Sequence, residues 1–251
     1  MPDACILMYV NRWTGRVLLA AVLVPAGCGS SHAAGPPGAP SGGTRLTATL
    51  SSPDSVRLSW TGGAPDPAGR VVEYANTPDG RYTVLAFVPP AQTTYTHPDL
   101  MPATTFYYRV RPYSGPASAP VQIQLPPGPV DDNAPEQDQP WAVPQKVAQP
   151  PVSARSIRGT DPAAAAPTGL VATLMPAGGV RFTWTDQASD EEGYLLEIRT
   201  PDAADYTVAE VLDPDVNSVG LLTLANQRTA TVRVRAFYYG AASNTVQERT
   251  G

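Results

Sequence analysis

VRFTWTDQASDEEGYLLEI, residues 180–198, decides the fold because it describes two strands joined by a turn. Its first part, VRFTW, alternates apolar with polar residues, so one face of an extended strand is apolar and the other is polar. Residues 186–193 are polar and charged and end in Gly, which is typical of an exposed turn. YLLEI then resumes the alternation. The stretch therefore predicts two neighbouring strands that meet around the aromatic Trp184.

The same pattern occurs earlier in the chain. VRLSW at residues 56–60 matches VRFTW at 180–184, with an offset of 124 residues. Four further segments keep this offset: Glu73 with Glu197, 82–84 with 206–208, Leu100 with Leu224, and 109–111 with 233–235. A constant offset over separate segments indicates an internal repeat. Two copies of about 80 to 85 residues, with short strands and turn signals, predict two all-β sandwiches in tandem.

Both copies resemble the fibronectin type III family of two-sheet sandwiches. The second strand of each copy ends in Trp60 or Trp184, and the resemblance implies that these are the core aromatics. Residues 100–110 resemble the sixth strand of the family, with Phe106 at the place of its corner tyrosine. Phe keeps the packing there but loses one hydrogen bond, typically worth about 0.5 to 1.5 kcal/mol. The second copy lacks this corner. The resemblance implies the fold and the core residues, and it says little about function.

The N-terminal residues predict a secretion signal. Residues 17–24 are uncharged, too short for a membrane span of roughly 20 residues but long enough for a signal. Residues 25–28, Pro-Ala-Gly-Cys, resemble the lipobox of bacterial lipoproteins, although Pro25 departs from its usual aliphatic residue. This resemblance implies cleavage before Cys28 and a lipid on its sulfur, such as palmitate. Gly29 resembles the signal of lipoproteins that move to an outer membrane. The alternative is ordinary cleavage near residues 33–34 and a secreted protein.

These features divide the chain into five parts. They are a signal peptide at 1–27, a Gly/Ser/Ala/Pro tether at 28–44, a first fibronectin type III domain at 45–125, a proline-rich linker at 126–165, and a second such domain at 166–248. The last strand of the first domain is expected at 121–125. The linker composition predicts a semi-rigid spacer between the sandwiches. Its Trp141 lies between prolines, and it either docks on a partner or packs back on one of the two sandwiches.

Two groups of residues are candidates for binding. The loop at 186–192 has four carboxylates, which suits Ca²⁺, but their spacing does not match an EF-hand, so we expect no metal. Tyr113, Tyr238 and Tyr239 are aromatic residues near strand ends, where a sugar or a protein contact would use them. The alternative for the tyrosines is packing in the core or across strands.

Charge and composition exclude several functions. The net charge is −5 and Lys146 is the single lysine, which argues against nucleic acid and against electrostatic attachment to anionic lipid. Cys5 lies in the signal, so the mature domains have no thiol. No catalytic motif or cofactor-binding motif stands out. We expect a non-enzymatic, lipid-anchored cell-envelope protein, a structural or interaction subunit with an envelope protein partner. The alternative is a carbohydrate-binding or adhesion module with a polysaccharide partner.

Overall fold

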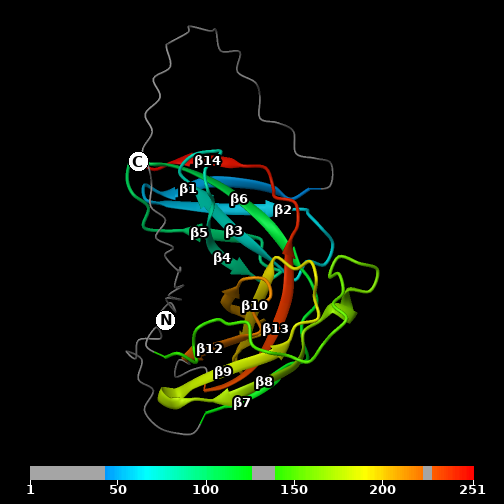
Figure 1. The fold of residues 1–251 in the computed structure, drawn as a ribbon. Coiled ribbons are helices and arrows are strands. Elements are labelled where there is room, and N and C mark those ends of the chain that lie inside the picture. Colours follow the sequence, from blue (N-terminus) through cyan, green and yellow to red (C-terminus); the bar gives the residue numbers. More distant parts are fainter. Residues whose placement is uncertain (1–42, 126–138, 223–227) are drawn as a thin grey trace, which may run out of the picture. The chain divides into compact units, whose positions relative to one another are not determined.

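The computed structural model describes residues 43–125, 139–222 and 228–251 (Figure 1). Within these ranges the helical structure consists of two short 3-10 turns, η2 (Pro162–Ala165) and η3 (Pro176–Gly178). Strands that pair in antiparallel sheets form the rest of the regular structure, in two sandwich-like halves. The predicted all-β, two-sandwich fold is confirmed. The expected signal peptide, the tether as far as residue 42 and part of the linker lie outside the described residues.

The first sandwich is built on residues 45–114. One sheet has the order β1 (Arg45–Ser52), β2 (Ser55–Thr61) and β5 (Thr94–His97), and its opposing sheet contains β3 (Gly69–Ala75), β4 (Thr83–Val88) and β6 (Thr105–Ser114). Val56, Leu58 and Trp60 alternate along β2 and are at most 2% exposed. The alternation read from VRLSW therefore places one face of β2 in the core, opposite the buried Phe106 of β6.

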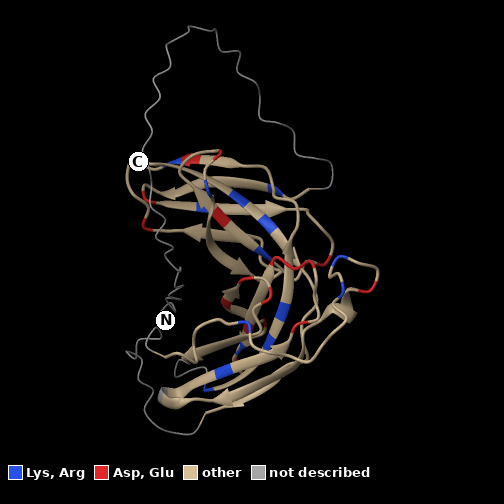
Figure 2. Ribbon diagram, in the orientation of Figure 1, with Lys and Arg blue, Asp and Glu red and all other residues tan. Residues whose placement is uncertain are grey.

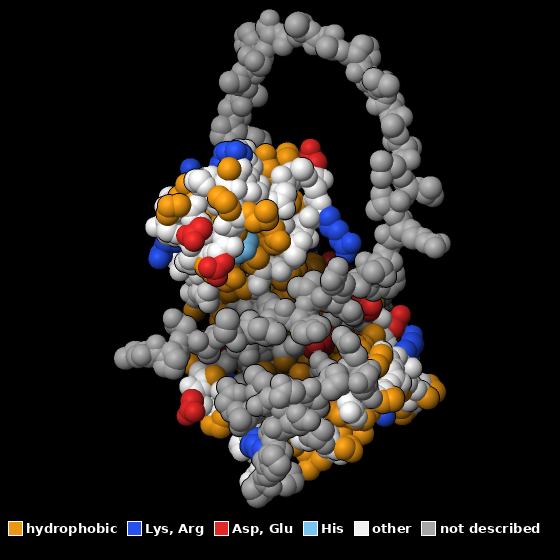
Figure 3. All heavy atoms as spheres, turned by 90° about the vertical axis from the view of Figure 1, so that its left-hand side faces the viewer, with side chains coloured by type: hydrophobic (Ala, Val, Ile, Leu, Met, Phe, Trp, Pro, Cys, Tyr) orange, Lys and Arg blue, Asp and Glu red, His pale blue; other side chains and the backbone are white. Residues whose placement is uncertain are grey.

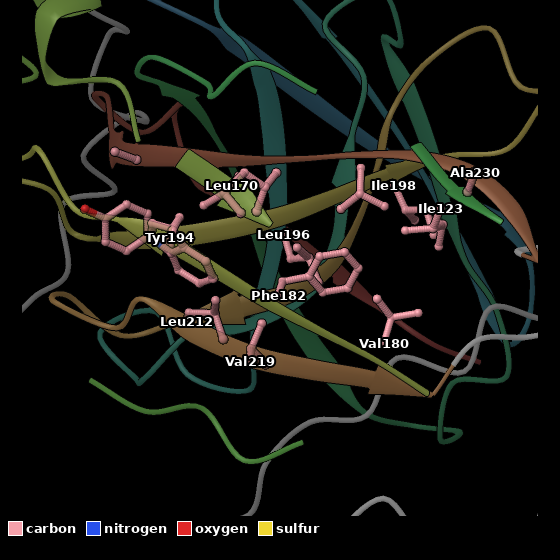
Figure 4. Close-up of a cluster of buried hydrophobic side chains, with 14 of the residues drawn as sticks. Ile123, Leu170, Val180, Phe182, Tyr194, Leu196, Ile198, Leu212, Val219 and Ala230 are labelled. Atoms are coloured by element: carbon pink, nitrogen blue, oxygen red, sulfur yellow. The ribbon is translucent and has the colours of Figure 1, made fainter. Parts of the chain in front are cut away.

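The second sandwich repeats this arrangement. One sheet has the order β8 (Thr168–Leu174), β9 (Gly179–Thr185) and β12 (Ser218–Leu222), and the other contains β10 (Gly193–Arg199), β11 (Thr207–Leu212) and β13 (Thr229–Tyr239). Figure 4 shows Phe182 of β9 and Leu196 of β10 among the buried side chains of this core. Trp184 is 3% exposed and packs against the ring of Tyr194, 5.6 Å between centroids.

The last strand of each repeat completes the other sandwich. β7 (Val121–Gln124), expected within the first domain, pairs with β13 of the second, and its Ile123 lies beside Ala230 in the second core (Figure 4). β14 (Val246–Arg249) pairs with β6 of the first sandwich, and Val246 packs against the first core. The assignment of these two strands to the sandwich of their own repeat is thus corrected. The physical reason is that the segments before these strands bind the neighbouring sandwich, where Ser118 N donates to Val234 O and Ser243 N donates to Val110 O, so each following strand continues against that sandwich.

The sixth strands of the two repeats also meet each other. β6 and β13 pair antiparallel where Ser114 faces Tyr238 and Tyr113 faces Tyr239. A small buried cluster surrounds this point and contains Tyr113, Leu195 and Phe237. The two sandwiches therefore share a hydrophobic contact in addition to their exchanged strands.

Each sandwich buries one glutamate on its third strand, held by arginines of the sixth. Glu73 is 5% exposed and accepts a hydrogen bond from Arg109 Nε at 2.7 Å. Glu197 is 2% exposed and is bound by both Arg233 and Arg235. Figure 2 shows these positive residues as blue segments along β6 and β13. Because burying a lone carboxylate is costly, each glutamate depends on its arginines.

The described part of the linker, residues 139–165, packs on the second sandwich. Gln145 N donates to Ser218 O at 2.8 Å and Gly220 N donates to Ala142 O at 3.0 Å, so the linker adds an extended segment to the edge of β12. Ile157 and Ala165 are buried in the second core. The expectation of a semi-rigid spacer between the sandwiches is corrected for these residues, because their backbone and apolar side chains find partners on the second sandwich.

Candidate functional site

The acidic loop between β9 and β10 contributes to a cluster of carboxylates. One oxygen each of Asp186, Glu191 and Asp215 lies within 4.8 Å of the others. Asp215 comes from the turn before β12 and was not singled out in the sequence, because an Asp in this distant turn has no metal-ligand spacing relative to the acidic loop. The cluster borders a pocket of about 150 Å³ between the linker and this end of the sandwich. Three carboxylates at this separation have the donor type that hard cations prefer.

Hydrogen bonds and charge set the properties of this cluster. Asp186 is buried and accepts hydrogen bonds from Ala188 N at 2.9 Å and from the Tyr194 hydroxyl. Burial, and then the bond to Asp186, raise the pKa of Tyr194, so the phenol remains a donor. Burial and the neighbouring Asp186 raise the pKa of Glu191. Asp215 faces Lys146 Nζ at 3.2 Å, which compensates one of the negative charges.

The other two carboxylates of the acidic loop hold the linker. Asp190 accepts hydrogen bonds from Ser156 Oγ at 2.6 Å and from Ile157 N at 2.7 Å. Burial raises the pKa of Asp190, but these hydrogen bonds outweigh it and leave the pKa below its usual value. Glu192 pairs with Arg158 at 2.8 Å. The loop thus divides into an outer pair that fixes the linker and an inner pair that joins the carboxylate cluster.

Trp141 lies against the second sandwich. A Cβ atom added at Gly179 would lie 2.0 Å from the Trp141 ring, and one added at Gly220 would lie 2.4 Å from it. The indole therefore packs directly on these two glycines, where a larger residue would displace it. Trp141 Nε1 donates to Gln139 Oε1 at 3.0 Å. Of the two interpretations of this residue, the structure shows packing on its own sandwich, and the ring is only partly exposed.

The three candidate tyrosines are engaged within the chain. Tyr113 is 4% exposed, and burial and Glu197 of the other repeat raise its pKa to about 12. Tyr239 stacks edge-on with Phe237, 5.1 Å between centroids. Tyr238 is half-buried under the Arg158 guanidinium, 4.5 Å from the ring centre. Tyr113 is therefore not exposed to a partner, because the contact between the repeats covers it.

The remaining sequence candidates are core or unplaced residues. Trp60, Phe106 and Trp184 are buried, and Phe106 lies against the rings of Tyr74 and His97. His97, the histidine within the described ranges, reaches the surface as the pale blue area in Figure 3. Cys28 lies outside those ranges.

Within the described part of the chain, no helix has the length and apolar character needed to cross a membrane. No protein-family model matches the sequence. No curated protein matches it either.

Two solved structures are similar over part of the chain. One is pectate lyase PelI from Erwinia chrysanthemi in complex with tetragalacturonic acid, at 20% identity and a TM-score of 0.27. That match covers 29% of this chain and 24% of the lyase chain, so the similarity spans about a quarter of the lyase. The other is a computationally redesigned β-sandwich protein, at 20% identity and a TM-score of 0.25, over 28% of this chain and 71% of the redesigned one.

Proposed function

We propose that this protein is a bacterial envelope lipoprotein with two sandwiches of the fibronectin type III kind, anchored by lipid at Cys28. It acts without catalysis, as a structural or protein-interaction subunit at an outer-membrane surface. The lipobox-like residues 25–28 and the Gly/Ser/Ala/Pro tether support the anchor. A tether of about 15 extended residues reaches at most about 50 Å, which holds the first sandwich close to the membrane.

One observation carries the proposal of a scaffold: each sandwich contains a strand of the other repeat. Two chain crossings and a shared apolar contact oppose bending between the halves. Surfaces on the two sandwiches are then presented to a partner at a fixed separation. Such preorganisation lowers the entropic cost of binding one partner at both surfaces.

The three tyrosines expected to contact a sugar or a protein are engaged within the chain. Tyr113 and Tyr239 pack between the two repeats, and Tyr238 lies under Arg158. A partner of either kind would therefore use other surfaces. We place the partner among envelope proteins because the fixed separation of the two sandwiches suits one rigid protein bound at both surfaces.

Palmitate labelling with membrane fractionation tests the anchor. The native chain is expected to incorporate label and to sediment with membranes, whereas Cys28→Ser is expected to lose both. A native chain that stays unlabelled and free in the medium would contradict the anchor and favour a secreted protein.

Site-specific photocrosslinking in intact envelopes tests the interaction role. Met101 of the first sandwich is 71% exposed and Val211 of the second is 46% exposed, so a photoreactive residue at either position leaves the fold undisturbed. We expect both positions to trap the same envelope protein, with much weaker adducts in the Cys28→Ser background. If the crosslinked proteins instead reflect only the abundance of each protein in the envelope, the chain has no specific partner. In a separate assay, turnover of a substrate by the purified chain would contradict the non-enzymatic role.

A further inference from the structure

The two segments that cross between the sandwiches share a sequence signature. GPAS at residues 115–118 matches GAAS at 240–243, with an offset of 125 residues. Each is followed, after two residues, by Val-Gln at the start of β7 or β14. The offset grows by one because β13 is one residue longer than β6. The internal repeat therefore includes the crossings themselves.

The matched serines make the same pair of hydrogen bonds. Ser118 N donates to Val234 O at 2.8 Å, and Ser118 Oγ accepts from Val234 N at 3.1 Å. In the other crossing, Ser243 N donates to Val110 O at 2.8 Å, and Ser243 Oγ accepts from Val110 N at 3.0 Å. Val110 and Val234 are equivalent positions of the repeat. Each serine thus satisfies both backbone groups of the valine in the opposite sandwich.

The matched glycines lie close to the opposite sandwich, and Gly115 is required by its backbone conformation. Gly115 has a φ of +133°, and an added Cβ would lie 2.1 Å from Ala236 O, so any larger residue is excluded there. Gly115 O accepts a hydrogen bond from Arg235 at 2.6 Å, and Gly240 O accepts one from the equivalent Arg111 at 3.5 Å. Arg235 also contacts the buried Glu197, so this arginine links the glutamate of the second repeat to the first crossing.

We infer that this duplicated motif encodes a reciprocal clasp, in which the strand after each Gly-x-x-Ser segment completes the opposite sandwich. The chain is then the covalent equivalent of a strand-exchanged pair, related by an approximate two-fold axis where β6 meets β13. Its first sandwich consists of residues 43–114 and 240–251, and its second consists of the described residues between 115 and 239. The domain borders therefore differ from the repeat borders. This inference does not depend on the lipid anchor.

Paired cysteines in the full chain test the clasp, in a background with Cys5→Ser and Cys28→Ser. Gln122 faces Thr231 and Gln247 faces Tyr107 in the exchanged register. None of these side chains is buried, so Cys replaces them without disturbing a core. The matched controls recombine the same four positions: Gln122 with Tyr107, and Gln247 with Thr231. These two pairs face each other only if each strand completes its own sandwich.

Mild oxidation followed by non-reducing electrophoresis and mass spectrometry reads the result. The exchanged pairs are expected to form disulfides within one chain, with yields at least about tenfold above both control pairs, since bridging requires Cβ atoms about 3.5 to 4.5 Å apart. The inference is overturned if the control pairs crosslink better, or if all four pairs crosslink equally. Disulfide-linked dimers from the exchanged pairs would also overturn it, because the clasp would then join two chains.

Discussion

Replacing Glu197 by Gln is expected to lower the free energy of unfolding by about 3 kcal/mol. The carboxylate is 3% exposed and is contacted by Arg233 Nε and by Arg235 at 3.0 and 3.2 Å. Gln keeps the shape and one acceptor but leaves two guanidinium groups without their counter-charge. Breaking a buried ion pair typically costs about 3 to 5 kcal/mol. The low end applies because Arg233 is 27% exposed and water reaches it.

The equivalent substitution Glu73→Gln is the matched control. Glu73 is bound by the single arginine Arg109, which is 28% exposed, so we expect a loss of about 1 to 2 kcal/mol. Urea unfolding followed by tryptophan fluorescence measures both values. With a slope of about 2 to 3 kcal/mol per molar urea, Glu197→Gln shifts the midpoint by about 1 to 1.5 M. Equal losses in the two variants, or a loss under about 1 kcal/mol for Glu197→Gln, would refute the reasoning.

Three further predictions concern single positions of the described residues. Glu191→Gln should raise the melting temperature at pH 7 by roughly 1 to 2 °C and have little effect at pH 4, because a raised pKa means that ionisation of Glu191 costs stability as pH rises. No gain at pH 7 would contradict this. Gly220→Ala should displace the Trp141 ring toward solvent and shift its emission to longer wavelength, with the spectrum of Trp141→Phe subtracted to isolate this indole; an unchanged emission spectrum would show that Gly220 does not make room for the ring. Burial lowers the pKa of His97, so the stability that the neutral imidazole contributes is present above pH 6.5 and is lost as pH falls below 6.5. His97→Gln should therefore reduce the fall in melting temperature between pH 7 and pH 5. An equal fall in the native chain and in His97→Gln would contradict this.

The strands were predictable because their signals are local. VRFTW and VRLSW alternate with a period of two, and the structure places their apolar residues in the cores. Burial requires only that one face of a strand be apolar, which the sequence displays directly. The repeat offset then predicted two similar sandwiches.

The pairing partners of the last strands were not predictable from that pattern. Val121 and Val246 occupy equivalent positions, so either one suits β6 or β13 by its side chains alone. The choice depends on the crossings, where Gly115 and Gly240 let the backbone approach the opposite sandwich. The repeated Gly-x-x-Ser motif was present in the sequence, but its offset of 125 falls outside the main repeat offset of 124.

The candidate site was only partly predictable for a similar reason. Asp186 and Glu191 belong to one loop, so their proximity follows from the sequence. Asp215 joins them through the packing of a distant turn, which no spacing rule indicates. The contacts of Trp141 depend on two glycines on different strands, Gly179 and Gly220, whose role appears only once β9 and β12 are paired.

Hydrogen exchange of the full chain, with one proline placed in either last strand, tests the reciprocal clasp most directly. Val246 faces Tyr108 and Val121 faces Val232, and both valines are half-buried, so Val246→Pro and Val121→Pro are matched perturbations. Val246→Pro is predicted to speed exchange in β6 of the first sandwich while β13 stays protected, and Val121→Pro is predicted to do the reverse. If Val246→Pro instead exposes β13 and Val121→Pro exposes β6, each strand completes the sandwich of its own repeat and the account is wrong.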